Sequence, residues 1–223
     1  MLAQKRKKPS IVQWLIFFVG LLVMSFGIVL TIKANLGAAP WDVLHVGLNK
    51  QFGLTIGTWS IIVGVIILST TSLLSKSLPQ LGAFLNMMLV GVFIDMYLLL
   101  PWLKTPDTVI GQVIMFIAGI VVLAYGMSFY ISANCGAGPR DSLMLVLMEK
   151  TKIKVQWIRL IMEVVVLSVG WLLGGPVFIG TIIFCIIIGH ITGFALPQCR
   201  VLVEHILHSH NHNHPVKQTA LTK

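Results

Sequence analysis

Six apolar segments of about 20 residues dominate this chain and set the class of fold. They cover residues 11–32, 58–75, 80–101, 109–131, 155–174 and 176–196. Each is long enough to cross about 30 Å of hydrocarbon as a helix. Only 10% of the 223 residues are charged, whereas soluble domains carry about 25%. We therefore expect an all-α polytopic membrane protein with six spans.

Two other counts of spans can be weighed against six. A five-span reading would merge residues 155–196 into one long helix and a half, but Gly174-Gly175-Pro176 breaks a helix at that point. An eight-span reading would need residues 40–50 and 139–149 to cross, and these segments are too short. The basic start and first apolar run resemble a signal peptide. The run is too long, however, and no small-residue cleavage site precedes residue 34, so we expect a retained span.

The cationic residues favour one orientation of these spans. With the N-terminus in the cytoplasm, 13 of the 16 Lys and Arg residues fall inside and 3 fall outside. The inside set is Lys5, Arg6, Lys7, Lys8, Lys76, Arg140, Lys150, Lys152, Lys154, Arg159, Arg200, Lys217 and Lys223, and the outside set is Lys33, Lys50 and Lys104. The positive-inside rule therefore places both termini in the cytoplasm. The net charge is +9, and we expect these cations to interact with anionic lipid headgroups. The sequence contains no basic face interleaved with aromatic residues, which would indicate binding to nucleic acid.

The chain repeats itself at an offset of 99 residues. "ANLGAAPWD" at residues 34–42 matches "ANCGAGPRD" at residues 133–141. Ten positions are identical within 25 residues, namely Gly20, Gly27, Ile32, Ala34, Asn35, Gly37, Ala38, Pro40, Asp42 and Leu44 in the first copy. The repeat divides the chain into a basic N-terminus (1–10), two three-helix repeats (11–101 and 109–197) and a polar, His-rich cytoplasmic tail (198–223). Because each repeat has an odd number of spans, the second should be inverted relative to the first.

Each residue type in the repeated motif has a physical purpose. Gly37 and Gly136 permit a chain reversal, and Pro40 and Pro139 suit the first turn of a helix. Aspartates two residues later complement the positive end of the helix dipole. Two placements of the following short helices remain open. They lie along opposite membrane faces, or they re-enter the bilayer and point their N-termini at a shared site.

Three further ionisable residues lie inside predicted spans, where a charge costs several kcal/mol or more. Asp95 either faces a polar cavity or reaches the interface. Glu163 lies four residues after Arg159, which suits a helix-surface ion pair, and His190 can hydrogen-bond a neighbouring helix. The candidate residues of a substrate path are Asn35, Asp42, Asp95, Asn134, Asp141, Glu163 and His190.

The remaining patterns favour packing over chemistry. Gly119 with Gly126, and Gly189 with Gly193, have the spacing of closely packed helices. Alternating histidines at 208, 210, 212 and 214 are typical of a solvated tail with weak metal affinity, so we expect no metal site. Cys135, Cys185 and Cys199 lack metal or disulfide spacing. We expect no enzyme and no cofactor, because HExxH, GxSxG and P-loop patterns are missing from the sequence.

"ANLGAAPWDVLHVGL", "GLTIGTWSIIVG" and "LNMMLVGVFIDMYL" resemble the YczE/YyaS/YitT-type bacterial integral membrane proteins. The resemblance extends from about Gly20 to Pro197, and the "LGAAPWD" and "VGVFID" segments are its most specific parts. It implies a multi-pass protein of the bacterial plasma membrane and supplies no substrate. Arg140 departs from the first copy of the motif, in which Trp41 stands.

The inverted repeats and in-membrane polar residues favour a transporter or channel for a small solute, with the bilayer and that solute as partners. The alternatives are a membrane scaffold or accessory protein of another complex, and a lipid-handling protein. The last would have a groove that opens laterally to lipid between the two halves.

Overall fold

The computed structural model describes residues 9–136 and 138–213, all of whose regular elements are helices. The helices are α1 (Ile11–Lys33), α2 (Pro40–Phe52), α3 (Ile56–Ser75), α4 (Leu81–Leu98), α5 (Val109–Ser132), α6 (Pro139–Thr151), α7 (Val155–Leu172) and α8 (Ile179–Asn213). Lys5–Lys8, Ala137, His214, Lys217 and Lys223, which the sequence analysis used, lie outside the described residues.

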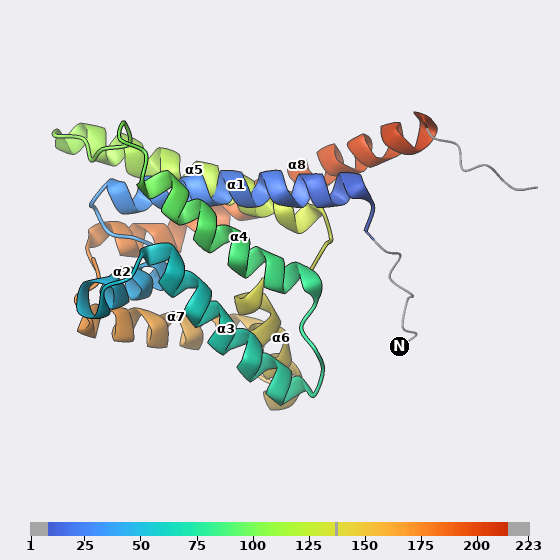
Figure 1. Ribbon diagram of the computed structural model, residues 1–223, viewed down its shortest axis with the longest axis horizontal. Helices are drawn as coiled ribbons and strands as arrows, with labels where there is room; N and C mark the ends of the chain where they lie inside the picture. Colours follow the sequence, from blue (N-terminus) through green and yellow to red (C-terminus); the bar gives the residue numbers. More distant parts are fainter. Residues whose placement is uncertain (1–8, 137, 214–223) are drawn as a thin grey trace, which may run out of the picture.

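The prediction of an all-helical protein with six spans is confirmed. Six of the described helices, α1, α3, α4, α5, α7 and α8, are long and apolar enough to cross a membrane. They run alternately in opposite directions along the molecule, so that α1 begins and α8 ends at the same end (Figure 1). The two short helices α2 and α6 begin at Pro40 and Pro139, as the motif predicted.

The end of the last span differs from the prediction. We expected a polar tail from residue 198, but α8 continues through Pro197 to Asn213. Cys199 and Val203 are buried, and Tyr125 of α5 donates a hydrogen bond to Gln198 over 3.0 Å. An apolar stripe on this segment therefore packs against α5, which stabilises helix where composition alone indicated a loose tail.

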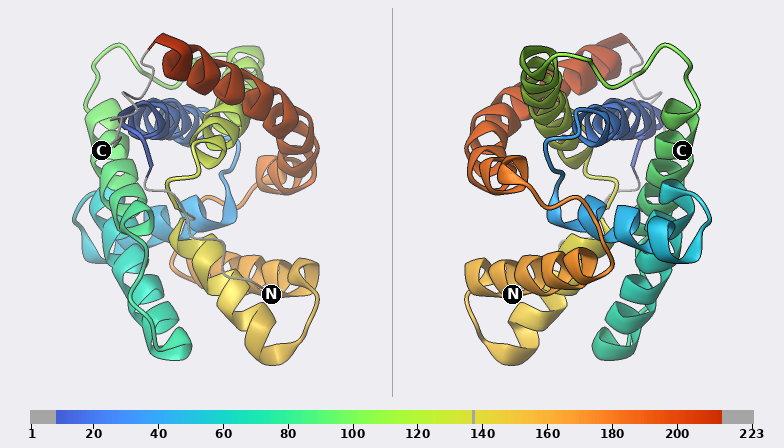
Figure 2. Two further views of the ribbon diagram at one scale, coloured as in Figure 1. Left: turned by 90° about the vertical axis from the view of Figure 1, so that its right-hand side faces the viewer. Right: turned by 90° about the vertical axis from the view of Figure 1, so that its left-hand side faces the viewer.

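The helices form two groups of four that face one another. One group is α1, α4, α5 and α8, which share the main apolar core, and the other is α2, α3, α6 and α7 (Figures 1 and 2). Each group takes two helices from each half of the sequence. The halves are thus interleaved rather than lying side by side as separate units.

Glycines hold α1 and α5 in close antiparallel contact at the centre of the first group. A Cβ atom on Gly27 would lie 2.4 Å from the Leu123 nitrogen, and one on Gly126 would lie 2.3 Å from the Met24 nitrogen. Gly20 approaches Tyr130, and Gly119 approaches Thr31, in the same way. These backbones meet where any side chain would separate them, which is the usual role of small residues between membrane helices.

Both chain reversals are built alike. Asn35 and Asn134 follow the ends of α1 and α5 with φ of 55°, a left-handed conformation that asparagine tolerates better than most residues. The Leu36 carbonyl accepts a hydrogen bond of 2.9 Å from the Gly180 nitrogen at the start of α8. The Cys135 carbonyl lies against Gly82 at the start of α4, 2.2 Å from where a Cβ would stand. Each reversal therefore rests on the first turn of the other half's last helix.

The contact between the two groups differs on its two sides. On one side, α3 and α4 pack closely, with Gly57 against Gly91, and Asp95 accepts hydrogen bonds from the Gly57 nitrogen and the Thr55 hydroxyl. On the other side, α7 and α8 stand apart (Figure 2). Gly189 and Gly193 of α8 have no atom within 4 Å of an added Cβ. The predicted close packing at this GxxxG pair is therefore not made within the described chain.

We expect Gly126→Ala to destabilise the protein and Gly193→Ala to leave it unchanged or slightly more stable. The first adds a methyl group against the Met24 backbone, and such overpacking costs about 1–3 kcal/mol. The second adds the same methyl group in open space. Thermal unfolding of both variants in one detergent checks this. Equal midpoints for the two variants would contradict the packing assigned to α1 and α5.

Candidate functional site

A central cavity of about 290 Å³ lies between the two groups of helices. All eight helices contribute to its wall. Its polar and charged lining residues are Asp42, His45, Ser60, Asn86, Tyr130, Arg140, Asp141, Arg159, Glu163, Cys185 and Thr192. The rest of the lining is largely apolar and includes five methionines, Met24, Met87, Met127, Met144 and Met162. This mixture is typical of a small-molecule site, whose apolar walls carry a few polar groups.

The first turns of α2 and α6 meet at this cavity. Pro40, Trp41 and Asp42 line it from α2, and Pro139, Arg140 and Asp141 line it from α6. The guanidinium carbon of Arg140 lies 4.5 Å from the centre of a Trp41 ring, a cation–π contact. Trp41 and Arg140 occupy equivalent positions of the repeat. The two copies of the motif, which are 99 residues apart in sequence, are therefore in direct contact.

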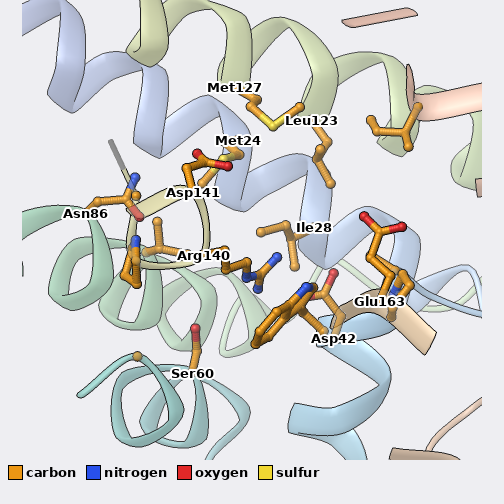
Figure 3. A pocket seen from close by; sticks show the side chains of 18 of the residues that line it. Met24, Ile28, Asp42, Ser60, Asn86, Leu123, Met127, Arg140, Asp141 and Glu163 are labelled. Atoms are coloured by element: carbon orange, nitrogen blue, oxygen red, sulfur yellow. The ribbon is translucent and has the colours of Figure 1, made fainter. Parts of the chain in front are cut away.

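Arg140 is enclosed by protein and yet accessible. Its side chain is exposed to the open space of the cavity, which it lines. Figure 3 shows the guanidinium between Asp42 and Asp141. Burial lowers the pKa of Arg140, while the nearby charges of Asp42 and Asp141 oppose that shift. Within the described chain, no carboxylate oxygen lies within 4 Å of its guanidinium nitrogens. Arg140 thus has charged neighbours but no direct ion pair.

Asp42 is the most enclosed carboxylate of the cavity, with 2% of its surface exposed. Burial raises its pKa to about 6, although the charge of Arg140 acts in the opposite direction. His45, one turn further along α2, has its Nδ1 3.9 Å from Asp42 Oδ1. Burial lowers the pKa of His45 to about 3, helped by Arg140. His45 is therefore neutral near pH 7 and forms no ion pair with Asp42.

The second half supplies most of the other charges. Arg159 and Glu163 of α7 form the predicted ion pair, with 3.0 Å between Nε and Oε1, and both line the cavity. Asp141 at the start of α6 has its pKa raised by burial and lowered by Arg140 and Arg159, with burial the larger effect. In the first half, Ser60 and Gly64 stand at the positions equivalent to Arg159 and Glu163. The lining positions are thus repeated while the charges on them are not.

Three polar side chains of the wall, Asn86, His45 and Thr192, have a buried hydrogen-bonding atom without a partner among the described residues. Asn86 of α4 is 7% exposed, and nothing in the described chain accepts a hydrogen bond from its Nδ2. His45 is 2% exposed, and its Nδ1 is likewise without a partner among the described residues. Buried polar atoms are rarely left unsatisfied in native proteins. Such atoms on a cavity wall indicate that something polar completes them.

The structure brings together three of the seven candidate residues of the path. Asp42, Asp141 and Glu163 share the cavity. Asn35 and Asn134 follow the ends of α1 and α5 in a left-handed backbone conformation, and Asp95 caps the start of α3. None of these three residues lines the cavity. His190 is exposed on α8, with Nδ1 2.8 Å from the Ile186 carbonyl oxygen, and is also absent from the lining.

Sequence reasoning left Arg140, Trp41, Asn86 and Tyr130 out of the candidate path. Arg140 had been counted among the cytoplasmic cations, whereas the structure places it in the cavity. One signal could have identified the first two residues. In an inverted pair, equivalent positions near the two-fold axis meet, and the motif differs most at Trp41 and Arg140.

Comparison with known proteins gives the family. A model for a family of unknown function, DUF6198, matches residues 11–197. The chain belongs to this family. It is 46% identical over 194 residues to the uncharacterized membrane protein YczE of Bacillus subtilis, covering 86% of this chain and 89% of the relative. The protein is therefore a membrane protein, and its resemblance to YczE-type proteins is confirmed.

Two more distant relatives cover much of the chain as well. The protein YyaS of Bacillus subtilis is 29% identical over 174 residues, covering 77% of this chain and 86% of the relative. An uncharacterized protein of Haemophilus influenzae is 29% identical over 181 residues, covering 81% and 82%. No solved structure gave a significant match.

We expect Asp42→Asn to reduce the pH dependence of stability between about pH 4 and 6. Because the pKa of the folded protein lies above the unfolded value of 3.8, the folded state holds the proton more tightly. Stability therefore falls as the pH rises through this window and stays low above it. The variant avoids the cost of burying a carboxylate, at most about 3 kcal/mol above pH 6.

Unfolding midpoints measured from pH 4 to pH 7 in detergent check this prediction. Asp107→Asn is the matched control, since Asp107 is exposed and lies outside the cavity. A wild-type profile that Asp42→Asn leaves unaltered would show that Asp42 is not buried as described.

Proposed function

We propose that this protein carries a small solute across the bacterial plasma membrane through the central cavity. The observation that carries the proposal is that the first turns of α2 and α6 line one cavity together. Discontinuous helices that aim their N-termini at a central site are the usual binding element of secondary transporters. A cavity of about 290 Å³ suits a solute of a few heavy atoms.

We further propose that the two repeats are inverted and related by a pseudo-two-fold axis. The glycine contacts between α1 and α5 support this, because Gly20 with Tyr130 and Gly119 with Thr31 exchange under the 99-residue offset. The reversals at Asn35 and Asn134, with equal φ, support it as well. The helix contacts support it too: α2 is equivalent to α6 and α3 to α7, so the contact of α2 with α7 corresponds to the contact of α6 with α3.

The unequal sides of the cavity suggest how access alternates. At an offset of 98 residues, Gly189 corresponds to Gly91, and Gly193 corresponds to Asp95. Gly91 packs against α3, whereas Gly189 packs against nothing in the described chain. In our proposal, this structure represents one state of the transporter, in which α3 is closed on α4 and α7 is separated from α8. Closing α7 on Gly189 would produce the opposite state, as expected when one repeat rocks against the other.

The separation of α7 from α8 also favours a second candidate function, lipid handling. Both helices line the cavity, yet they do not pack on one another. Cys185, Arg159 and Glu163 are lining residues whose surfaces are partly or fully accessible. A groove that opens sideways to lipid would have this form, although it lies between two helices of the second half and not between the two halves. A scaffold function has no comparable supporting feature.

The proposed orientation places both ends of the described chain in the cytoplasm. The end of α3 before Lys76, the last turn of α6 with Lys150 and the start of α7 after Lys154 lie at the end of the molecule where α1 begins (Figure 1). The end of α1 with Lys33, the end of α2 with Lys50 and the α4–α5 connection with Lys104 lie toward the other end. This distribution supports the positive-inside assignment.

Cysteine accessibility tests the transport proposal. In a variant lacking the three native cysteines, we expect Ser60→Cys in the cavity to react with a charged, impermeant thiol reagent from either side of the membrane. Val65→Cys, on the exposed face of the same helix, is the matched control and should be shielded by lipid. Ser60→Cys that reacts from neither side would contradict transport, since a scaffold needs no accessible cavity.

A second variant tests the alternation. Gly189→Leu adds a side chain in open space, so we expect the unfolding midpoint to stay unchanged. The same side chain would prevent α7 from closing on α8, and Ser60→Cys should then react from one side only. Unchanged labelling from both sides would refute the closure of α7 on Gly189.

A further inference from the structure

The charges around the cavity occur in both signs and are close to balanced. The ion pair of Arg159 and Glu163 is neutral by itself. Arg140 with Asp42 and Asp141 carries one excess negative charge. The N-termini of α2 and α6 also face the cavity and contribute roughly half a positive charge each. The site as a whole is therefore near neutrality, which disfavours a solute with a net charge.

The same groups are not satisfied by one another. Arg140 has no carboxylate oxygen within 4 Å among the described residues. The carboxylates of Asp42 and Asp141 accept no hydrogen bond from any described residue, and the nearest ionisable atom to Asp42, His45 Nδ1, is 3.9 Å away. Asp42 is buried, and a buried charge without a direct partner costs several kcal/mol, whereas Arg140 is open to the cavity. The cavity thus lacks one anionic partner for Arg140 and at least one cationic partner for the aspartates.

A second, independent observation indicates a bound ligand. Asn86 is 93% buried, and its side chain is part of the cavity lining shown in Figure 3. Its Nδ2 makes no well-formed hydrogen bond in the described chain, and the Tyr130 hydroxyl lies close to its side chain. An anionic group bound between Asn86 and Arg140 would offer an acceptor oxygen to each donor, and a carboxylate or phosphate is the natural partner of a guanidinium.

We propose that the cavity binds a zwitterion, a solute that has an anionic group and an ammonium group but no net charge. Arg140 and Asn86 bind the anionic group, and Asp141 or Asp42 binds the ammonium. The apolar wall, rich in methionine, accommodates the remaining atoms, and thioethers adapt to varied shapes. This inference rests on the proposed function and names its class of substrate.

Two sources can supply this chemistry, an amino-acid-like solute in water or the headgroup of a zwitterionic lipid. The opening between α7 and α8 is compatible with either source. The charge requirement is the same for both, and the experiment separates them.

The purified protein is tested with the protein amino acids and glycine betaine, and separately with micelles containing phosphatidylethanolamine or phosphatidylglycerol. Binding is measured by the shift in unfolding midpoint and by tryptophan fluorescence, for which Trp41 is a reporter inside the cavity. For each amino acid that binds, the amine lacking its carboxylate and the acid lacking its ammonium are compared.

We expect at least one zwitterion to bind at least about 30-fold more tightly than its amine and its acid, since loss of one partner from a buried charge pair has at least this effect. If phosphatidylethanolamine binds and phosphatidylglycerol does not, the zwitterionic ligand is a lipid headgroup. Equal or tighter binding of the charged analogues, or no binding by any zwitterion of either source, would overturn the inference.

Arg140→Gln distinguishes recognition from mere folding. We expect Arg140→Gln to lower the affinity for the zwitterion at least about 30-fold and to change the affinity for the matching amine less than about 3-fold. Arg200→Gln removes the same charge from an exposed position outside the cavity and should change neither. Equal losses for zwitterion and amine would refute the role of Arg140. If no zwitterion binds but Ser60→Cys still reacts from both sides of the membrane, the proposed substrate class is refuted and the transport proposal is not.

Discussion

The close crossing of α1 and α5 determines where the rest of the molecule lies. Glycines on both helices bring the two backbones together, with Gly27 against Leu123 and Gly126 against Met24. Each helix then ends in an asparagine with left-handed backbone, and the chain turns back toward the centre. Because the two helices are antiparallel and tightly packed, both reversals return to the same region (Figure 1). Without this contact, α2 and α6 would have no shared site to begin at.

The charged groups of the cavity follow from this geometry. Two helix N-termini at one place concentrate partial positive charge, and an aspartate in each first turn opposes it. Trp41 and Arg140 meet because they are equivalent positions close to the proposed axis. The two halves share a backbone plan but differ in side chains, since Arg140, Arg159 and Glu163 replace a tryptophan, a serine and a glycine. Such a difference lets a repeated fold contain a single, polar binding site.

The sequence was sufficient for the architecture because the signals for it are local. Apolar length identified six spans, and Gly, Pro and Asp at fixed spacing identified the starts of α2 and α6 to the residue. The extent of α8 was not predictable, since its extension beyond Pro197 depends on burial of Val203 in the core and on the hydrogen bond of Gln198 with Tyr125 of α5. The cavity was only partly predictable. Asp95, like Asp42, was a candidate residue of the path, but the packing of α4 against α3 makes it a cap of α3 instead. Arg140 could be assigned to the cavity only once α2 and α6 were seen to meet.

The central claim is that the starts of α2 and α6 touch, and crosslinking tests it most directly. In a cysteine-free background, Trp41→Cys with Arg140→Cys should be joined efficiently by a short bismaleimide in native membranes. Trp41→Cys with Lys152→Cys is the control, since Lys152 follows the far end of α6, about 18 Å from Arg140 at the rise of a helix. Short helices lying on opposite faces of the bilayer would be about 30 Å apart. Efficient linking of the first pair alone is the result we predict, and failure of that pair to link would contradict the account.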